Sequence, residues 1–354
     1  MAGGIGSRFW PVSRTTYPKQ FIDFFGIGKT LIQSTYERFL QICPPENIFI
    51  VTNDIYVDLV KEQIIGIKDH QILAEPIMRN TAPCIAYGSM KIAKINPDAV
   101  IVVAPSDHTI GNQAEFIKSI EQSMEAAANN KCLITLGIKP NRPDTGYGYI
   151  QYVEETLASD PTIHKVKTFT EKPNLELAQS FVQSGDFLGN AGIFIWSAKS
   201  IKLALEKHLP DMHEIFQQGN AFYNTSSEIE FIANAYLQCT NISIDFAVME
   251  KADNVYVLPS AFGWSDLGTW ASIYELAEKD YVGNAVIPAD HVMMYDSSNC
   301  MVNVPGKKLV ILQGLHNYIV VESNNTLMIC PRSEEQHIKN IVADVKVKFG
   351  NKFI

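Results

Sequence analysis

The sequence predicts an α/β domain with a mixed, mostly parallel sheet, followed by a small β domain. Short β-branched runs alternate with amphipathic segments over the first two thirds of the chain. From about Gly283 onward, strand-like runs follow one another without helices between them. The first pattern is typical of a sheet with helices on both faces, in which ligands bind at the carboxyl ends of the strands. The second pattern is typical of a separate β structure.

Each expected element follows from its own hydrophobic pattern. In the first part, β-branched and apolar runs predict strands at residues 48–52, 72–74, 99–104, 133–136 and 193–196. Helical periodicity predicts helices at residues 31–43, 55–65, 82–95 and 116–128. In the second part, runs between Ser, Asn and Gly turns predict strands at residues 292–295, 309–312, 318–321 and 327–329. We therefore expect one domain over residues 1–262, and a helical connector, a small β domain and a charged C-terminal helix over residues 263–354.

Composition limits the function classes. Of 354 residues, 46% are apolar and 19% are charged, which fits a globular protein with an ample core. The formal net charge of −9 argues against non-specific nucleic-acid binding. The longest apolar stretch, residues 99–105, is far shorter than the roughly 20 residues that span a bilayer. Six cysteines without a CxxC pair are typical of reduced thiols in a cytoplasmic protein, and the eight histidines show no metal-binding spacing.

A glycine-rich turn opens the chain as AGGIGSRFWP, residues 2–11. Such glycines let backbone N–H groups approach phosphate oxygens, and Arg8 could then contact phosphate through two of its guanidinium nitrogens at once. The pattern is neither the dinucleotide-binding fingerprint nor a Walker A loop, and by itself it could be an ordinary tight turn. Lys19, in the sequence PKQF, could reach the same phosphates or could be a solvated surface charge.

A series of motifs, beginning with the opening turn, runs along nearly the whole chain: AGGIGSRFWPVSR, YPKQF, EPIMRNTAP, APSDH, PDTGYGYI, TEKP, NAGIFIW, ISIDFAVME and GWSDLGTW. In these motifs and their order the chain resembles the sugar-nucleotide pyrophosphorylases, and among them the mannose-1-phosphate guanylyltransferases. The resemblance implies a Rossmann-like nucleotidyltransferase fold of the GT-A-like kind for the first domain, and a left-handed β-helix-like fold for the small β domain.

The resemblance implies a reaction in which GMP passes from GTP to α-D-mannose 1-phosphate, giving GDP-mannose and pyrophosphate. The sugar phosphate attacks the α-phosphorus in line, assisted by Mg²⁺. A phosphate monoester has its second pKa near about 6, so the nucleophile is largely dianionic at neutral pH and needs no general base. The enzyme must therefore supply charge neutralisation, alignment and a metal ion.

Two aspartates are the implied Mg²⁺ ligands. Asp107 follows an apolar strand, where it could instead cap the next helix, and Asp266 lies in a turn, where it could simply be a turn residue. Two carboxylates with phosphate oxygens form a set of ligands that a hard cation prefers. The implied catalytic residues are Arg8, Lys19, Asp107 and Lys172.

The resemblance also implies which residues bind each substrate. Guanine offers a carbonyl acceptor and N–H donors, so we expect Asn80 or Thr81 to contact it, although Arg79 could merely brace that loop. Lys172 and Glu171 would bind the sugar phosphate and the sugar hydroxyls, or could be an ordinary surface pair. The nucleotide-binding residues are Ala2, Gly3, Gly4, Gly6, Ser7, Arg8, Lys19, Glu75, Asn80, Thr81 and Ser106, and the sugar-phosphate-binding residues are Gly146, Glu171, Lys172 and Asn190.

Departures from the family pattern are mild. Ser7 stands where threonine is common, Asp144 where glutamate is usual and Ala191 where serine is usual, which bears on sugar preference more than on activity. Two alternatives stay open: a guanylyltransferase for another sugar 1-phosphate, and a catalytically silent regulatory paralogue that binds nucleotide-sugar. The presence of every implied charged residue favours an active enzyme. The resemblance implies a homodimer, with no nucleic acid or membrane as a partner.

The two ends of the chain lead to separate expectations. A phosphate-binding loop normally follows a buried strand, and here only Met1 precedes it. We therefore expect a missing first, central strand, a natural protein that starts several residues upstream, and Met1 as a misassigned start or a fragment boundary. No region after residue 354 could form the isomerase domain of longer relatives, so guanylyl transfer alone is expected.

Overall fold

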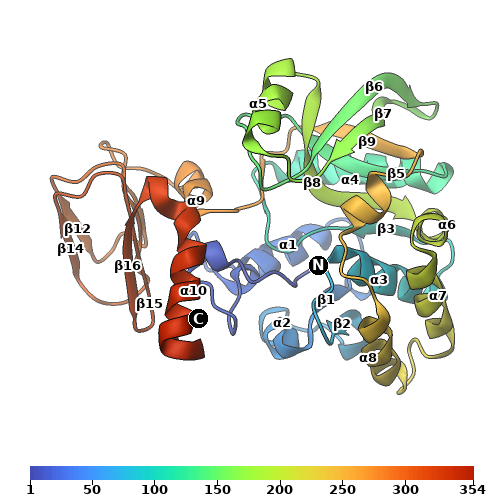
Figure 1. Ribbon diagram of the computed structural model, residues 1–354, viewed down its shortest axis with the longest axis horizontal. Coiled ribbons are helices and arrows are strands. Elements are labelled where there is room, and N and C mark those ends of the chain that lie inside the picture. The colour runs from blue at the N-terminus through green and yellow to red at the C-terminus, as the bar shows by residue number, and fades with distance from the viewer. The chain divides into compact units, whose positions relative to one another are not determined.

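The computed structural model describes residues 1–354, which form two compact units (Figure 1). The first unit contains residues Met1–Gly3, Arg38–Pro105 and Ile110–Trp264. The second contains Gly4–Glu37, Ser106–Thr109 and Ser265–Ile354. The segment that follows the first three residues therefore belongs with the C-terminal third of the chain. Three elements cross the boundaries between the units: α1 (Leu31–Phe39), β4 (Thr109–Ile110) and β10 (Trp264–Ser265).

A six-stranded sheet forms the centre of the first unit. Its strands in spatial order are β3 (Val100–Val103), β8 (Phe187–Ser197), β5 (Leu133–Ile138), β9 (Val255–Ser260), β7 (Asp160–Thr170) and β6 (Tyr149–Leu157). Only β5 and β9 pair in parallel; every other pairing in this sheet is antiparallel. The expectation of a mostly parallel sheet is therefore wrong for the largest sheet. The sheet is mostly antiparallel because β8 lies between β3 and β5 and runs antiparallel to both. In addition, β6 and β7 form an antiparallel hairpin.

A second, two-stranded sheet of the first unit is parallel, as expected. It consists of β1 (Ile50–Asn53) and β2 (Ile72–Glu75). The backbone N–H of Ala2 donates to the carbonyl oxygen of Val51 at 2.7 Å, and the Met1 amino group donates to that of Ala104 at 2.8 Å. Residues 1 and 2 therefore hydrogen-bond both to β1 and to the segment that follows β3.

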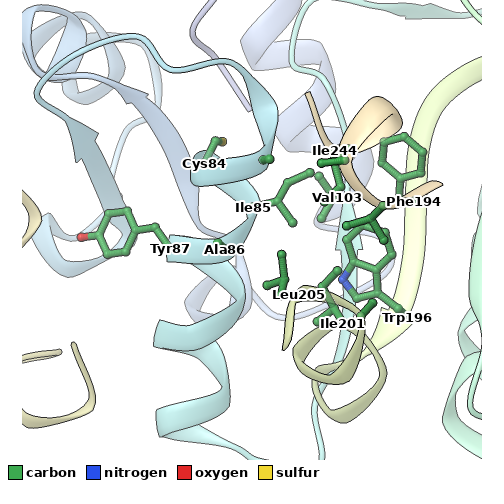
Figure 2. Packing of buried hydrophobic residues seen from close by; sticks show 14 of the residues in the cluster. Cys84, Ile85, Ala86, Tyr87, Val103, Phe194, Trp196, Ile201, Leu205 and Ile244 are labelled. Carbon is green, nitrogen blue, oxygen red and sulfur yellow. The ribbon is translucent and has the colours of Figure 1, made fainter. Parts of the chain in front are cut away.

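Helices cover both faces of the central sheet. Alternate side chains of β8 point to opposite faces: Phe194 and Trp196 join one core cluster, and Ile193 and Ile195 join another. Figure 2 shows the first cluster, where Trp196 lies near Leu205 of α6. The helices of this unit are α2 (Val57–Gln63), α3 (Thr81–Ile95), α4 (Gln113–Asn129), α5 (Leu175–Ser184), α6 (Ala198–His208), α7 (Pro210–Gln218) and α8 (Glu228–Gln238). The four helices expected between residues 31 and 128 are confirmed as α1 to α4, with ends that differ by a few residues.

The second unit contains the expected β domain. Parallel pairing joins β11 (Ala285–Ile287), β13 (Met301–Asn303) and β15 (Tyr318–Ser323), and separately β12 (Val292–Tyr295) and β14 (Val310–Gln313). Successive strands from β11 to β15 alternate between these two sheets. Each strand therefore pairs in parallel with the strand two positions further along the chain, as in a β-helix. The remaining elements are α9 (Trp270–Leu276), β16 (Thr326–Pro331), which pairs antiparallel with β15, and α10 (Ile338–Phe349).

Two further findings concern the whole chain. All six cysteines are free thiols. None of the helices combines the length and the apolar character that crossing a membrane would require.

Candidate active site

The glycine-rich turn requires glycine most clearly at Gly6. Its backbone has a φ of +69°, in the left-handed region that residues with a Cβ rarely adopt. A Cβ at Gly6 would also lie 2.5 Å from the Cβ of Lys19, whereas a Cβ at Gly4 would meet no atom within 4 Å. The turn leads into a single 3₁₀ turn, Ser7–Phe9, in which the Phe9 N–H donates to the Gly6 carbonyl oxygen at 2.9 Å. Gly6 therefore lets the turn and Lys19 approach closely.

Lys19 is a buried cation and not a solvated surface lysine. Only 5% of its surface is exposed. Its Nζ donates to the backbone oxygen of Asp266 at 2.6 Å and lies 3.0 Å from Oδ2 of Asp107. The same nitrogen lies 5.8 Å from the centre of the Phe9 ring. Lys19 therefore connects the two predicted metal ligands to the glycine-rich turn.

The Asp107 carboxylate stays ionised within this cluster. Burial by itself would raise its pKa, but the nearby Lys19 ammonium and the His108 ring hold the pKa below its ordinary value. His108 Nε2 lies 3.7 Å from Oδ1 of Asp107. Burial, reinforced by Lys19 and opposed by Asp107 and Asp266, lowers the pKa of His108. His108 is not among the predicted site residues, although its position beside Asp107 in the APSDH motif was a signal.

The donor types in this cluster fit a magnesium ion. No group of three or more His, Cys, Asp or Glu residues is placed to hold a metal ion on its own. Asp107 offers a carboxylate 3.0 Å from the Lys19 ammonium, and Asp266, whose backbone oxygen accepts from the same Nζ atom, carries a second carboxylate. Mg²⁺ commonly binds through one or two carboxylates and takes its other ligands from phosphate oxygens and water. A metal ion that arrives with the phosphate groups therefore suits this pair.

Two other residues of the second unit carry polar atoms without a partner. The hydroxyl of Ser106 is buried and makes no hydrogen bond. The Nε atom of Arg8 is likewise buried and unpaired. Because buried donors are nearly always hydrogen-bonded, unpaired ones are candidates for contacting a ligand. Both atoms belong to residues in the predicted phosphate-binding set.

In the first unit, Glu75 ends β2 as a buried carboxyl group. Its Oε1 accepts a hydrogen bond from the Tyr236 hydroxyl at 2.9 Å, and a Cβ at Gly3 would lie 3.7 Å from its Oε2. Burial raises the pKa of Glu75 to about 7, against the opposing effects of Tyr236 and the chain's amino terminus. The carboxyl group thus lies between Tyr236 and the first glycine of the turn, and it titrates near neutral pH.

Asn80 and Thr81 form the start of α3. The Oδ1 atom of Asn80 accepts from the backbone N–H of Thr81 at 3.0 Å, as a helix cap does. The hydroxyl oxygen of Thr81 accepts from the backbone N–H of Ile244 at 2.9 Å. The side chain of Asn80 is exposed, and its backbone has a φ of +66°. Of the two candidates, Asn80 therefore presents its amide N–H₂ group to solvent, while Thr81 holds the segment before Asp245.

Glu171 and Lys172 differ sharply in exposure. They form an ion pair of 2.6 Å between Oε1 and Nζ, but 59% of the lysine side chain is exposed against 7% of the glutamate side chain. Oε2 of Glu171 is buried and has no partner. A Cβ at Gly148 would lie 2.4 Å from that oxygen, so glycine is required there. Oε2 of Glu171 can therefore accept a hydrogen bond from a hydroxyl group. In an ordinary surface ion pair, this oxygen would be exposed to water.

Asn190 is oriented by three hydrogen bonds. Its Oδ1 accepts from the Thr135 hydroxyl and from the Gly192 N–H, each at 3.1 Å. Its Nδ2 donates to Oδ1 of Asp245 at 3.0 Å. These partners determine which end of the amide is oxygen, so the side-chain N–H₂ group faces Asp245.

Asp245 lies in the site although it is not among the predicted site residues. It begins a one-turn π-helix, Asp245–Met249, a local structure that is frequent at functional sites. Burial, and next the Glu171 carboxylate, raise its pKa to about 6. The signal in the sequence was a carboxylate that stands between apolar residues in the motif ISIDFAVME. The structure therefore places an additional titrating carboxyl group beside Asn190 and Glu171.

Gly146 lies in a turn that the Asp144 side chain stabilises. Oδ1 of Asp144 accepts from the Gly146 N–H at 2.8 Å, and its Oδ2 lies 3.3 Å from Nη2 of Arg142. The Tyr149 hydroxyl accepts from the Asp144 N–H at 2.9 Å. The departure from glutamate at position 144 therefore falls on the residue that shapes this glycine turn.

Comparisons with known proteins agree across nearly the whole chain. Residues 1–282 match the family described as nucleotidyl transferase, and residues 290–345 match the MannoseP isomerase/GMP-like beta-helix domain. A mannose-1-phosphate guanylyltransferase from Klebsiella pneumoniae is 36% identical over 351 residues, which are 98% of this chain and 73% of that protein. The Escherichia coli protein of the same name shows the same identity and coverage. A crystal structure from Thermus thermophilus, described as a mannose-1-phosphate geranyltransferase, covers 98% of both chains with a TM-score of 0.86 and 28% identity.

Proposed function

The chain belongs to the nucleotidyl transferase family of enzymes, and on this premise we propose that it transfers GMP from GTP to α-D-mannose 1-phosphate. The products are GDP-mannose and pyrophosphate. The observation that carries the proposal is the buried Lys19, joined to Asp107 and to the backbone of Asp266 next to the glycine-rich turn. A buried ammonium ion held by one carboxylate and one backbone oxygen is costly unless it serves a charged ligand or a tight ion pair, and here it stands among the residues that the family motifs provide.

The reaction needs no proton transfer from the enzyme. A phosphate oxygen of mannose 1-phosphate attacks the α-phosphorus of GTP, a new P–O bond forms, and the bond between the α-phosphorus and the bridging oxygen breaks. The electron pair leaves with pyrophosphate. Because the attacking phosphate is already a dianion at neutral pH, the protein contributes positive charge and alignment.

We assign charge neutralisation to residues of the second unit. Arg8 and Lys19 bind oxygens of the triphosphate, together with backbone N–H groups of the glycine-rich turn and the unpaired hydroxyl of Ser106. Asp107 and Asp266 would hold Mg²⁺, which supplies positive charge to the phosphate oxygens as negative charge develops on the leaving group. Lys19 is held in place before substrate arrives, so little reorganisation is needed during the reaction.

We assign recognition of the guanine base and the sugar to residues of the first unit. The exposed amide of Asn80 donates to the guanine carbonyl oxygen, and Glu75 accepts from guanine N–H groups in its ionised form. Lys172 binds the phosphate of mannose 1-phosphate, and the unpaired Oε2 of Glu171 accepts from a sugar hydroxyl.

Asp245 joins the sugar-binding residues, and Asn190 holds it there. The hydrogen bond from Asn190 Nδ2 leaves the amide one further N–H for a sugar hydroxyl. Two carboxyl groups and an amide form a set of acceptors and donors suited to neighbouring hydroxyls of a sugar. Gly146 and Gly148 let the backbone approach the ring closely.

The test is pyrophosphate release from GTP by the full chain, with and without Mg²⁺, in the presence of mannose 1-phosphate. We expect Mg²⁺-dependent release that requires both substrates and stops when the metal is chelated. Glucose 1-phosphate and a heptose 1-phosphate serve as competing substrates, because the Asp144 turn bears on sugar choice. A preference for either would change the assigned sugar, and no release with any sugar phosphate would refute nucleotidyl transfer and leave the silent paralogue.

A further inference from the structure

The segment that follows the glycine-rich turn is built into the C-terminal unit. Residues 4–37 belong to the same compact unit as residues 265–354. Phe9, Trp10 and Phe24 share a core cluster with Trp270 of α9 and Ile338 of α10. The ring centres of Phe9 and Trp270 lie 5.3 Å apart, edge to face. The apolar residues just after the turn are therefore buried against the C-terminal domain.

The end of the chain hydrogen-bonds to this segment. The indole N–H of Trp10 donates to the backbone oxygen of Phe353 at 2.7 Å. Phe353 lies in a short 3₁₀ turn, Gly350–Phe353, directly after α10. Trp10 is only 6% exposed and stands two residues after Arg8. The indole thus links the turn that carries Arg8 to the chain's last helical turn.

Arg14 makes a second, separate link. Its Nη2 donates to the backbone oxygen of Ser323 and to the hydroxyl of Thr326, each at 3.1 Å. These two acceptors lie at the end of β15 and the start of β16, in the tight turn between the strands. Its Nε donates to the backbone oxygen of Pro11 at 3.1 Å. The Arg14 guanidinium therefore hydrogen-bonds both within its own segment, to Pro11, and to the β domain.

Arg8 lies in the 3₁₀ turn Ser7–Phe9, which contacts α10. The pKa of Lys339, in the first turn of α10, is lowered by burial and by the neighbouring Arg8 guanidinium. Two cations held close together repel each other and gain from an anion that binds between or beside them. The C-terminal helix therefore contributes to the surroundings of the arginine that the proposed function places on phosphate.

We propose that the C-terminal β domain and α10 position the glycine-rich turn for nucleotide binding, through Trp10 and Arg14. This inference rests on the proposed function, because it takes Arg8 and the turn to bind the triphosphate. Glycine-rich backbone loses much conformational freedom when it becomes ordered. If the turn is already ordered by the folded C-terminal domain, that loss does not weaken substrate binding. Trp10 and Arg14 are positioning residues, since they act through the turn and contact no substrate.

The experiment compares two positioning variants with a matched control. Trp10→Phe removes the indole donor and keeps an aromatic ring in the core, and Arg14→Met removes the guanidinium and keeps a long side chain. Tyr274→Phe is the control, because it deletes a side-chain donor to the backbone oxygen of Gly283 at 2.7 Å in the same unit. Thermal unfolding identifies any variant that fails to fold.

Steady-state kinetics then separates positioning from stability. We expect Trp10→Phe and Arg14→Met each to raise the KM for GTP by about fivefold or more, with the KM for mannose 1-phosphate unchanged. Tyr274→Phe should lower the melting temperature without changing either KM. The proposal is overturned if the positioning variants lower the melting temperature as the control does and leave the KM for GTP unchanged.

A separate readout keeps this proposal distinct from the proposed function. Equilibrium binding of GTP, measured without sugar phosphate, reports on nucleotide binding separately from the transfer reaction. If the unaltered chain binds GTP but transfers nothing, the proposed function fails and the binding comparison still decides the positioning role. If Trp10→Phe does not fold, Arg14→Met carries the same comparison, because its side chain is partly exposed. Equal GTP affinity in Arg14→Met and the unaltered chain would then overturn the proposal.

Discussion

Replacing Asp245 with asparagine should stabilise the protein and weaken its use of the sugar phosphate. Asp245 is 9% exposed, and burial beside Glu171 raises its pKa from 3.8 to about 6. Asparagine keeps an oxygen that can accept from Asn190 Nδ2 and removes the negative charge. The substitution therefore tests whether a costly buried charge is retained for binding.

The pKa shift sets the size and the pH range of the effect on stability. A shift of about 2 units corresponds to about 3 kcal/mol at about 1.36 kcal/mol per unit. The folded state holds the proton more tightly than the unfolded state, so folding stability falls as the pH rises from 3.8 to about 6. Above that pH range the ionised Asp245 carboxylate lowers the free energy of unfolding by the full amount of about 3 kcal/mol. Asp245→Asn should therefore raise the free energy of unfolding by up to about 3 kcal/mol at pH 8, and by little near pH 4.

Scanning calorimetry of the full chain at pH 4 and pH 8 measures this difference. In a unit of this size, each kcal/mol moves the melting temperature by roughly 2–4 °C. Asp98→Asn is the control, because Asp98 forms an exposed pair with Lys199 at 2.6 Å and should change the free energy of unfolding by less than about 0.5 kcal/mol at either pH.

The same variant should lose sugar recognition. Removing one charged acceptor of a hydroxyl is expected to raise the KM for mannose 1-phosphate by about tenfold or more, with the KM for GTP unchanged. A variant with no extra stability at pH 8 and an unchanged KM for the sugar phosphate would refute the reasoning about Asp245.

Three further substitutions test the assigned roles. Lys172→Ala should weaken the use of mannose 1-phosphate far more than GTP binding, because the exposed ammonium is assigned to the sugar phosphate; equal losses in kinetics and GTP binding would contradict that role. Asp107→Asn should reduce turnover by about a hundredfold or more and raise the Mg²⁺ concentration needed for half-maximal rate, and an unchanged rate would remove it from the site. Gly6→Ala should lower kcat/KM for GTP by about tenfold or more, since a Cβ there meets the Lys19 side chain at 2.5 Å in a left-handed backbone; an unchanged kcat/KM would argue against the close approach.

Local patterns in the sequence predicted most of the elements but not how the strands pair. Strands β1, β2, β3 and β5 and helices α1 to α4 stand within a few residues of their expected positions. The direction of β8 was not predictable, because an apolar run such as residues 193–196 is compatible with both parallel and antiparallel pairing. The hairpin of β6 and β7 has mixed burial and weak alternation, so it produced no clear strand signal.

The candidate site shows the same division. Motif order along the chain pointed to Lys19, Asp107 and Asp266, and the structure brings these three together: Lys19 Nζ contacts the Asp107 carboxylate and the backbone oxygen of Asp266. The sequence could not show that the Asn190 amide faces Asp245, because that hydrogen bond joins residues 55 positions apart in the chain.

The sequence by itself determined the residue types of the site, the periodicity of most helices and strands, and the family of the chain, since each of these depends on residues close together or on motif order. Only the tertiary structure decided that residues 4–37 pack with residues 265–354, and that Asp245 lies among the sugar-binding candidates. Such contacts arise when distant segments bury their apolar side chains together, and nothing in the local sequence of either segment specifies its partner.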